Sequence, residues 1–537
     1  MTQVVQPPAA VATPSPADRS ARRAGTVAFW IAIGLLLLVG LVLRFVARSA
    51  LWLDEAQSVA IAELPLSGTH TTLWEGLRQD GSPPLYYLLL HGWMTLFGSS
   101  GHAVRTLSAL LNLACLPPLY LLARRVVGKR PAAVVVLLFI TSPFALYFAT
   151  ETRMYDLLML LSLLGGLAVE RTLRDPGPWP AVGVAVCSGL VALTHYWSLY
   201  LLATLGLGLL IGSLRGRTHL RRRGSRWALG GVLAGGVVFA PWLGVFLYQA
   251  KHTGTPWGAP AAFAAVVHAF GEWCGGATTT GRAMLVLVAA LLAFAVFGRA
   301  LGPRQILIDL RGHEPGRALM LLSIGTLVIA VAAGQIVGNA WADRYTATAF
   351  IPFLLVLALG TERLVDTRVF AGSLLLLGLL GDVSGSGKVL QERTQAAEVA
   401  GVLRAQAHAG DVVLYCPDQL GPAVGREIAG GRTPAGLHHH TIPTYGPPGR
   451  VDWVDYEQRN ISADPGRLAA RALAEAGRRH AVWLVFSGEY RTTEGLCSNL
   501  RQALNQQRTV TQELRAKAPD MSYEREEVYR YPPTPRR

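Results

Sequence analysis

Charged side chains are scarce in this sequence. Only 15% of the 537 residues are Asp, Glu, Lys or Arg, whereas 51% are hydrophobic and the mean hydropathy is +0.34. Soluble proteins carry roughly 25% charged residues, so this chain has too few charges to cover a surface in water. The scarcity excludes an ordinary soluble protein and favours an integral membrane protein.

Cysteine is scarce as well. The chain has five cysteines, and none of them shows the Cys-x-x-Cys spacing of zinc sites. The sequence therefore gives no support to a cysteine-based metal centre. Cys416 and Cys497 both lie in the C-terminal part of the chain, where they could form a disulfide in an oxidising compartment or remain two buried thiols. Both alternatives stay open at this point.

Acidic residues are outnumbered by basic ones, 34 against 49, which leaves a formal net charge of +15. In a soluble protein such an excess would suggest nucleic-acid binding. Here the arginines gather in short loops between apolar segments, as at 124–130, 215–226 and 299–317. This is the positive-inside bias of membrane proteins, and we expect no nucleic-acid partner.

Long apolar segments are abundant. Residues 26–47 contain Arg44 as their only charge, and about 20 apolar residues suffice to span a bilayer. Further segments of this kind predict an α-helical polytopic membrane protein with about 11 transmembrane helices. The expected spans are 26–47, 103–123, 131–149, 154–170, 179–196, 198–213, 227–249, 283–299, 318–338, 346–361 and 369–384.

The distribution of arginines also predicts the orientation. A cytoplasmic N-terminus places every arginine-rich loop in the cytoplasm. This orientation of the loops requires that residues 84–97, an apolar segment of about 14 residues, do not cross the membrane. We expect that segment to be a re-entrant or juxtamembrane helix on the outer side of a cell membrane.

The chain changes character after residue 384. Residues 26–384 are the predicted membrane domain. We expect residues 1–25, which precede it, to form a disordered cytoplasmic tail because they are rich in proline and alanine. Residues 385–537 carry more charge and are expected outside the cytoplasm as a small α/β domain. Its predicted helices and strands are helix 398–407, strand 411–416, helix 468–476 and strand 481–486.

Ionisable residues near a bilayer are costly and are functional candidates by default. In this chain they collect on four separate elements that the topology brings to the outer face. The candidates are Asp54 and Glu55 after the first span, Glu151, Arg153 and Tyr155 at the fourth, His195 and Tyr196 between the fifth and sixth, and Asp343, Arg344 and Tyr345 at the tenth. Because all of these residues are expected at the same face of the membrane, they predict a single site.

Some of these residues also have purely structural interpretations. Glu151 and Arg153 could pair with each other at a helix end, and His195 could be a packed, hydrogen-bonded histidine. Arg344 could anchor the chain at the lipid headgroups. Asp54 and Glu55 could lie in an exposed first turn of a helix.

The sequence resembles the GT-C glycosyltransferases, especially their protein O-mannosyltransferase and aminoarabinose-transferase branch. The resemblance is carried, in this order between residues 50 and 350, by Trp-Leu-Asp-Glu-Ala, Asp-Gly-Ser-Pro-Pro-Leu-Tyr-Tyr, Val-Arg-Thr-Leu-Ser-Ala-Leu, Glu-Thr-Arg-Met-Tyr, Thr-His-Tyr and Asp-Arg-Tyr. It does not cover the C-terminal domain. One departure is Gly81-Ser82-Pro83, where the aminoarabinose branch has Glu-Lys-Pro; this argues against aminoarabinose as the sugar.

The resemblance implies a glycosyltransferase that moves a sugar, most commonly mannose, from a polyprenyl-phosphate donor to an acceptor hydroxyl, with inversion. Such a reaction needs a general base and cations near the leaving phosphate. The acceptor could be a glycan, a lipid or a protein. The expected roles are catalysis for Asp54 and Glu55, donor-phosphate binding for Arg153, Arg344, His195 and Tyr345, and substrate binding for Glu151, Tyr155, Tyr196 and Asp343.

No cofactor is expected, although Asp54, Glu55 and Glu151 could together hold a divalent cation. The main alternative function is a transporter or flippase of lipid-linked precursors, whose intramembrane charges would lie in the middle of its spans and in repeated halves of the chain. A non-catalytic protein that binds a cell-wall partner is a second alternative.

Overall fold

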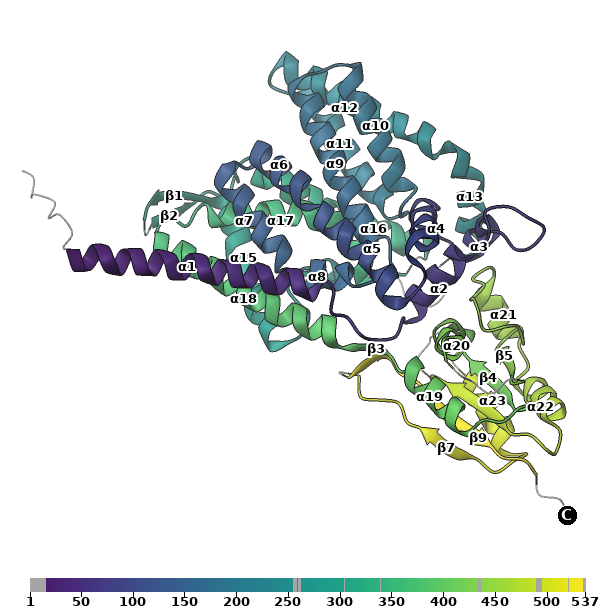
Figure 1. Ribbon diagram of the computed structural model, residues 1–537. Helices are drawn as coiled ribbons and strands as arrows, with labels where there is room; N and C mark the ends of the chain where they lie inside the picture. Colours follow the sequence, from purple (N-terminus) through teal and green to yellow (C-terminus); the bar gives the residue numbers. More distant parts are fainter. Residues whose placement is uncertain are drawn as a thin grey trace, which may run out of the picture.

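The computed structural model describes residues 16–254, 258, 262–303, 305–338, 340–431, 436–488, 495–519 and 521–534. These residues form a helical membrane domain with a smaller α/β domain at one end of it (Figure 1). The first helix, α1, begins at Pro16 and takes in the last ten residues of the predicted tail. Residues 1–15 of that tail lie outside the described residues.

Within the described part of the chain, eight helical stretches are long and apolar enough to cross a membrane, and a bent pair would make nine. The eight are α1 (Pro16–Leu43), α5 with α6 (Gly101–Ala114, Leu116–Val126), α11 (Ser198–Arg215), α12 with η1 and α13 (His219–Phe239, Ala240–Trp242, Leu243–His252), α15 (Thr279–Phe297), α16 (Gly316–Val337), η2 with α17 (Asp343–Thr346, Ala347–Thr361) and α18 (Thr367–Leu390). The chain is thus a multi-span membrane protein.

Two of the predicted spans do not meet this criterion. They are the helices α9 (Tyr155–Arg174), which carries charged residues near both of its ends, and α10 (Pro178–Ala192), which has only 15 residues. Both helices pack within the bundle, α10 against α9 and α12. By length and composition the structure therefore supports eight or nine spans rather than about 11.

The bent pair consists of α7 (Lys129–Ile140) and α8 (Pro143–Ala149), which meet at 55° within the span predicted at 131–149. Pro143 explains the break, because proline lacks an N–H and disfavours a helical conformation in the residue before it. The Ser142 hydroxyl then accepts a hydrogen bond from the Ala145 N–H at 3.3 Å and caps α8.

Three short helices connect α1 to α5: α2 (Leu53–Ala62), α3 (Leu73–Asp80) and α4 (Leu85–Phe97). A capping box of Thr72 and Glu75 starts α3, and Gly81, with a φ of 82°, ends it. The 13-residue α4 is the predicted short helix, too short for a crossing. Further along the chain come α14 (Ala264–Trp273) and a hairpin of β1 (Gly298–Gly302) and β2 (Gln305–Ile308) that the sequence did not predict.

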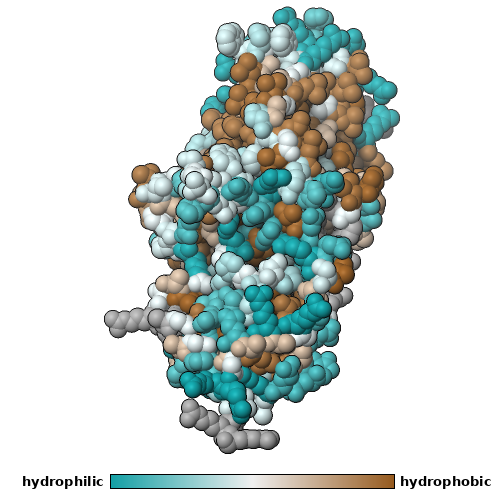
Figure 2. Space-filling view, turned by 90° about the vertical axis from the view of Figure 1, so that its right-hand side faces the viewer, coloured by the Kyte–Doolittle hydropathy of each residue, from teal (hydrophilic) through white to brown (hydrophobic). Residues whose placement is uncertain are grey.

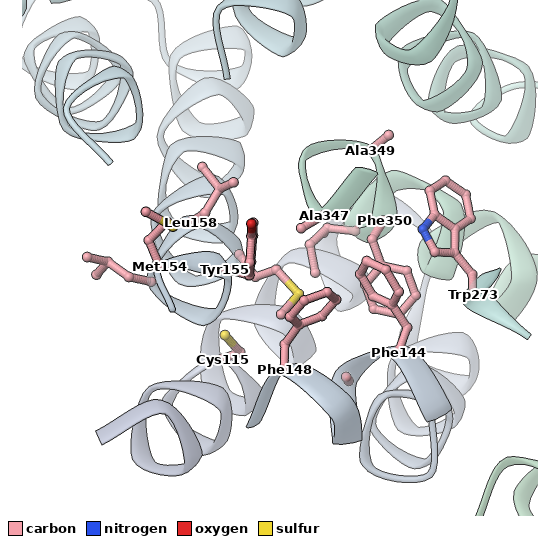
Figure 3. Packing of buried hydrophobic residues seen from close by; sticks show 14 of the residues in the cluster. Cys115, Phe144, Phe148, Met154, Tyr155, Leu158, Trp273, Ala347, Ala349 and Phe350 are labelled. Carbon is pink, nitrogen blue, oxygen red and sulfur yellow. The ribbon is translucent and has the colours of Figure 1, made fainter. Parts of the chain in front are cut away.

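Buried aromatic rings join α8, α9, α14 and α17 (Figure 3). The Phe144 ring lies 4.7 Å from the rings of both Phe148 and Phe350, and the Trp273 indole donates a hydrogen bond of 2.8 Å to the Thr346 hydroxyl. This packing fixes the start of α9 next to η2. Arg153 and Arg344, which lie at these two positions, are thereby brought to the same region.

The C-terminal domain is built on a five-stranded sheet with the order β5-β4-β6-β9-β7, in which β5, β4 and β6 are parallel and the remaining pairs antiparallel. Its strands are β3 (Glu392–Thr394), β4 (Val412–Cys416), β5 (His438–Thr441), β6 (Val482–Phe486), β7 (Thr511–Leu514), β8 (Ser522–Glu524) and β9 (Glu527–Tyr531). Its helices are α19 (Ala396–Gln406), η3 (Asp418–Leu420), α20 (Gly421–Ala429), α21 (Tyr456–Ser462), α22 (Pro465–Ala476) and α23 (Leu496–Asn505).

This domain confirms the α/β character predicted from the sequence, including its four predicted helices and strands. Cys416 and Cys497 form a disulfide between β4 and α23, which settles the open alternative. The predicted boundary after residue 384 falls inside α18. That helix continues to Leu390, and Lys388 in its last turn pairs with Glu272 of α14 at 3.0 Å.

The surface matches this division. Figure 2 shows hydrophobic side chains concentrated on the helical half of the molecule and a largely hydrophilic C-terminal domain at the bottom of the view. Leu233 and Val237 of α12, for example, are 71% and 75% exposed. Large apolar side chains on an outer face are stable in lipid and costly in water.

Candidate active site

A cavity of about 480 Å³ lies where the membrane domain meets the C-terminal domain. Its walls come from the start of α2, the turn after α3, the 195–200 segment, α13, η2 and one loop of the C-terminal domain. Six of the ten predicted site residues line it: Asp54, Arg153, His195, Tyr196, Arg344 and Tyr345.

Asp54 lies in the first turn of α2, where the unpaired N–H groups of a helix favour a negative charge. Its Oδ2 is 3.3 Å from Nη2 of Arg344 and 4.0 Å from Nε of Arg153. The Asp54 side chain is 16% exposed. One carboxylate thus faces two guanidinium groups within a partly enclosed cavity.

Arg153 is held in place from several sides. Its Nη1 donates hydrogen bonds to Ser58 Oγ at 2.9 Å, to the Tyr87 hydroxyl at 3.4 Å and to the backbone oxygen of Asp54 at 3.4 Å. Burial alone would lower the pKa of Arg153, but Tyr87 and Asp54 outweigh it and raise the pKa above its ordinary value. The guanidinium therefore stays charged.

Arg344 is positioned by aromatic rings. Its guanidinium carbon lies 5.7 Å from the Trp52 ring centre and 5.5 Å from that of Tyr345, within the range of cation–π attraction. Trp52 directly precedes α2, so the same indole supports both the helix that carries Asp54 and the arginine opposite it. The ion pair is thus held by packing on both sides.

His195 is a neutral hydrogen-bond donor. Its Nδ1 accepts the Trp197 backbone N–H at 3.1 Å, which leaves the proton of the neutral ring on Nε2. Burial, together with Arg153 and Arg344, lowers the pKa of His195 to about 3. The ring packs against Tyr345 at 5.0 Å between centroids. An uncharged N–H donor thus stands beside the two arginines.

Glu55, expected to be a second catalytic carboxylate, does not line the cavity and is fully buried. Arg105 binds it with two hydrogen bonds of 2.8 and 2.6 Å, the Thr152 N–H donates another at 2.9 Å, and Arg393 lies at 3.5 Å. Burial would raise the pKa of Glu55, but Arg105 and Arg393 together lower it below its ordinary value. The structure gives Glu55 the part of a positioning residue that ties α2 to α5 and to the C-terminal domain.

Glu151, Tyr155 and Asp343 likewise lie outside the cavity lining. Glu151 accepts a hydrogen bond of 3.0 Å from the Trp52 indole, and burial raises its pKa to about 7. Tyr155 packs among apolar side chains (Figure 3), 4.7 Å from the Phe148 ring. Asp343 accepts a hydrogen bond of 3.0 Å from the Trp341 indole.

The lining also contains polar and aromatic residues that were not predicted as site residues, among them Gln57, Asp80, Gln249 and Trp453. Asp80 accepts hydrogen bonds from the Gln57 amide at 3.1 Å and from the Tyr87 hydroxyl at 2.9 Å. A signal for Asp80 existed, since it opens the Asp-Gly-Ser-Pro-Pro motif. Trp453 had none, because it lies in the part of the chain that the family resemblance does not reach.

One group of three residues in the described part of the chain has a geometry suited to a metal ion: His268, Glu272 and Asp343, whose ligand atoms lie within 4.8 Å of one another. Lys388, 3.0 Å from Glu272, competes for that carboxylate. The alternative set of Asp54, Glu55 and Glu151 does not converge, because arginines engage Glu55. None of His268, Glu272 and Asp343 lines the cavity.

The chain is similar to known proteins in sequence and in fold. Residues 81–245 match the family model described as dolichyl-phosphate-mannose-protein mannosyltransferase. ArnT from Cupriavidus metallidurans, solved without ligand, superimposes with a TM-score of 0.56 at 14% identity, over 94% of this chain and 98% of that one. This chain has the GT-C fold. The structure of the same ArnT bound to undecaprenyl phosphate gives a TM-score of 0.53 with the same identity and coverage. No curated protein matches this chain in sequence.

The GT-C likeness extends beyond the membrane domain. An alignment over 94% of this chain must include most of the C-terminal domain, which the sequence motifs left uncovered. An identity of 14% supports the fold and nothing finer. The roles of individual residues in this GT-C protein therefore rest on the geometry of the cavity itself.

Proposed function

We propose that this protein is a glycosyltransferase that moves a sugar from a polyprenyl-phosphate donor to an acceptor hydroxyl on the outer face of the membrane, with mannose as the first sugar to test. The observation that carries the proposal is the Asp54 carboxylate facing Arg153 and Arg344 in one cavity. The family model over residues 81–245, whose description names dolichyl-phosphate-mannose, supports this donor class, as does the undecaprenyl phosphate bound to ArnT.

The donor phosphate would bind the two arginines. Arg153 and Arg344 stay charged, and a guanidinium can offer two parallel hydrogen bonds to a phosphate. The phosphate would take over contacts that Asp54 now makes with them, so donor binding would free the carboxylate for the acceptor. His195 can add a hydrogen bond from Nε2 to a phosphate or sugar oxygen without adding charge.

Transfer would then follow by direct displacement. The acceptor oxygen attacks the anomeric carbon, the bond from that carbon to the phosphate oxygen breaks, and the acceptor proton moves to Asp54. The polyprenyl phosphate leaves with the bonding electrons, and the arginines stabilise its growing negative charge. Attack from the face opposite the leaving group inverts the anomeric centre.

The outer face follows from the charge of the loops. The arginine-rich segment 215–226, which includes the turn between α11 and α12 and the start of α12, lies at the end of the bundle away from the C-terminal domain (Figure 1). If that end is cytoplasmic, as the positive-inside rule predicts, the cavity and the C-terminal domain lie outside. Transport receives no comparable support, because the charged groups of the cavity gather at one end of the bundle and not in the middle of its spans.

The test is transfer of labelled mannose from polyprenyl-phosphate-mannose to a membrane acceptor extract by protein reconstituted in liposomes. Asp54→Asn keeps the size of the side chain but cannot take a proton, and loss of a general base costs about 10²–10⁴-fold in rate. Asp175→Asn, on an exposed carboxylate at the end of α9, is the matched control and should transfer like the wild type. Equal rates for Asp54→Asn and the wild type would exclude Asp54 as the base.

A further inference from the structure

The C-terminal domain contributes a wall to the cavity. Among the described residues that line it, Trp453 is the one that belongs to this domain. It lies in a segment, 451–455, between β5 and α21, and α20 of the same domain packs against α2. We call residues 451–455 the strap.

Hydrogen bonds fix the strap to three elements of the membrane domain. The Gln57 amide of α2 donates to the Val451 oxygen and accepts the Val451 N–H, both at 2.9 Å. The Trp453 backbone N–H donates to the backbone oxygen of Gln79 at 3.0 Å. Near α13, the Asp455 N–H donates to the backbone oxygen of His252 at 2.7 Å. Most of these bonds use backbone atoms of the strap, so the side chain of Trp453 is left to serve the cavity.

The Trp453 ring packs against apolar and aromatic side chains and also lines the cavity. Its centre lies 4.9 Å from the ring of buried Tyr456, in a small cluster with Val451 and Leu53. The cavity next to it carries the carboxylate of Asp80 and the amide of Gln57. An indole face beside a carboxylate and an amide suits a sugar ring, whose C–H faces are apolar and whose hydroxyls donate and accept hydrogen bonds.

We propose that Trp453, Asp80 and Gln57 form a binding site for a sugar ring of the acceptor, so that the acceptor is a carbohydrate chain. The role as acceptor site rests on the proposed function. The phosphate of the donor is assigned to Arg153 and Arg344, and its prenyl tail must stay in the membrane. A water-soluble glycan would approach from the side of the C-terminal domain, where Trp453 lies.

The first test is direct binding and needs no transfer. Full-length protein in nanodiscs is applied to arrayed oligosaccharides, and undecaprenyl phosphate binding is measured on the same samples. Loss of an aromatic anchor worth about 1.4 kcal/mol weakens binding about tenfold, so Trp453→Ala should lower the signal on bound glycans about tenfold. Trp453→Phe should retain most of it. Trp179→Ala, on an indole that is 84% exposed at the start of α10, is the matched control and should bind like the wild type.

The outcomes separate this site from the proposed function. Undecaprenyl phosphate should bind equally well to the wild type and all three variants, and in a transfer assay Trp453→Ala should raise the KM for the acceptor without changing the KM for the donor. The proposal is overturned if the wild type binds none of the glycans, if Trp453→Ala binds them unchanged, or if peptides serve as acceptors in their place. Glycan binding that persists without any sugar transfer would instead count against the glycosyltransferase.

Discussion

Asp54 and Glu55 are neighbours in the sequence, and the structure predicts opposite consequences for their loss. Glu55 is fully buried and receives hydrogen bonds from Arg105 and Thr152, with Arg393 at 3.5 Å. The side chains of Arg105 and Arg393 are 7% and 3% exposed. Glu55→Gln removes the charge that compensates both arginines and retains roughly the same volume.

The expected cost follows from that burial. Removal of one partner from a buried ion pair destabilises a protein by about 3–5 kcal/mol, because the remaining charge is left without compensation. Asp54 faces a cavity that water can enter, so Asp54→Asn should cost only a fraction of this. Thermal unfolding in nanodiscs, followed by tryptophan fluorescence, should show a much lower Tm for Glu55→Gln and a Tm near the wild-type value for Asp54→Asn.

Activity completes the comparison. Asp54→Asn should be stable and nearly inactive, whereas the folded fraction of Glu55→Gln, assayed below its Tm, should keep most of its transfer rate. A matched control is Glu170→Gln, which removes a carboxylate paired with arginines at the other end of α9, where its side chain is 13% exposed. A Glu55→Gln protein with wild-type stability and no activity would refute the division of roles, since it would place Glu55 on the substrate.

Further predictions concern the cations, the titrating groups and the disulfide. Arg344→Lys replaces the planar fork with a single ammonium and should raise the KM for the donor about 10–100-fold, the equivalent of a charged hydrogen bond; an unchanged KM would argue against phosphate at this position. Burial raises the pKa of Glu151 to about 7 from 4.5, so the folded state favours its protonated form. The contribution of Glu151 to stability should therefore be highest below about pH 4.5 and fall, by on the order of 3 kcal/mol, as the pH rises through 7. Glu151→Gln should abolish that part of the pH dependence in unfolding experiments, and a persistent slope would assign it to another group. Reduction of the disulfide between Cys416 and Cys497 should destabilise the C-terminal domain by about 2–5 kcal/mol, measured by protease resistance of the domain, with Cys187→Ser, on a partly buried free cysteine, as the control.

Much of the fold could be read from local sequence. The apolar runs predicted the helices of the bundle, because a run of about 20 uncharged apolar residues favours a membrane-spanning helix whatever the rest of the chain does. Strands 411–416 and 481–486 were likewise visible as short buried runs. By length and composition eight or nine stretches of the described chain qualify as spans, against about 11 predicted, because α9 carries charges near both of its ends and α10 is short.

The bend at Pro143 and the C-terminal half of α18 show a second limit. Pro143 was present in the sequence, but the angle between α7 and α8 depends on how both helices pack against their neighbours. Helix α18 runs past the predicted boundary, and there Lys388 contacts Glu272, more than a hundred residues away in the chain. Contacts between distant residues leave no mark on local composition.

The sequence by itself determined that this is a membrane protein with an α/β domain at its C-terminal end, and which charged residues reach one end of the bundle. Only the tertiary structure decided which of them face a common cavity. Consecutive residues of a helix point about 100° apart, so either Asp54 or Glu55 can face the cavity, but not both. Arg105 on α5 and Arg393 before α19 bind Glu55 and thereby turn Asp54 toward Arg153 and Arg344. That choice, and the addition of Trp453 to the wall, required the chain to fold.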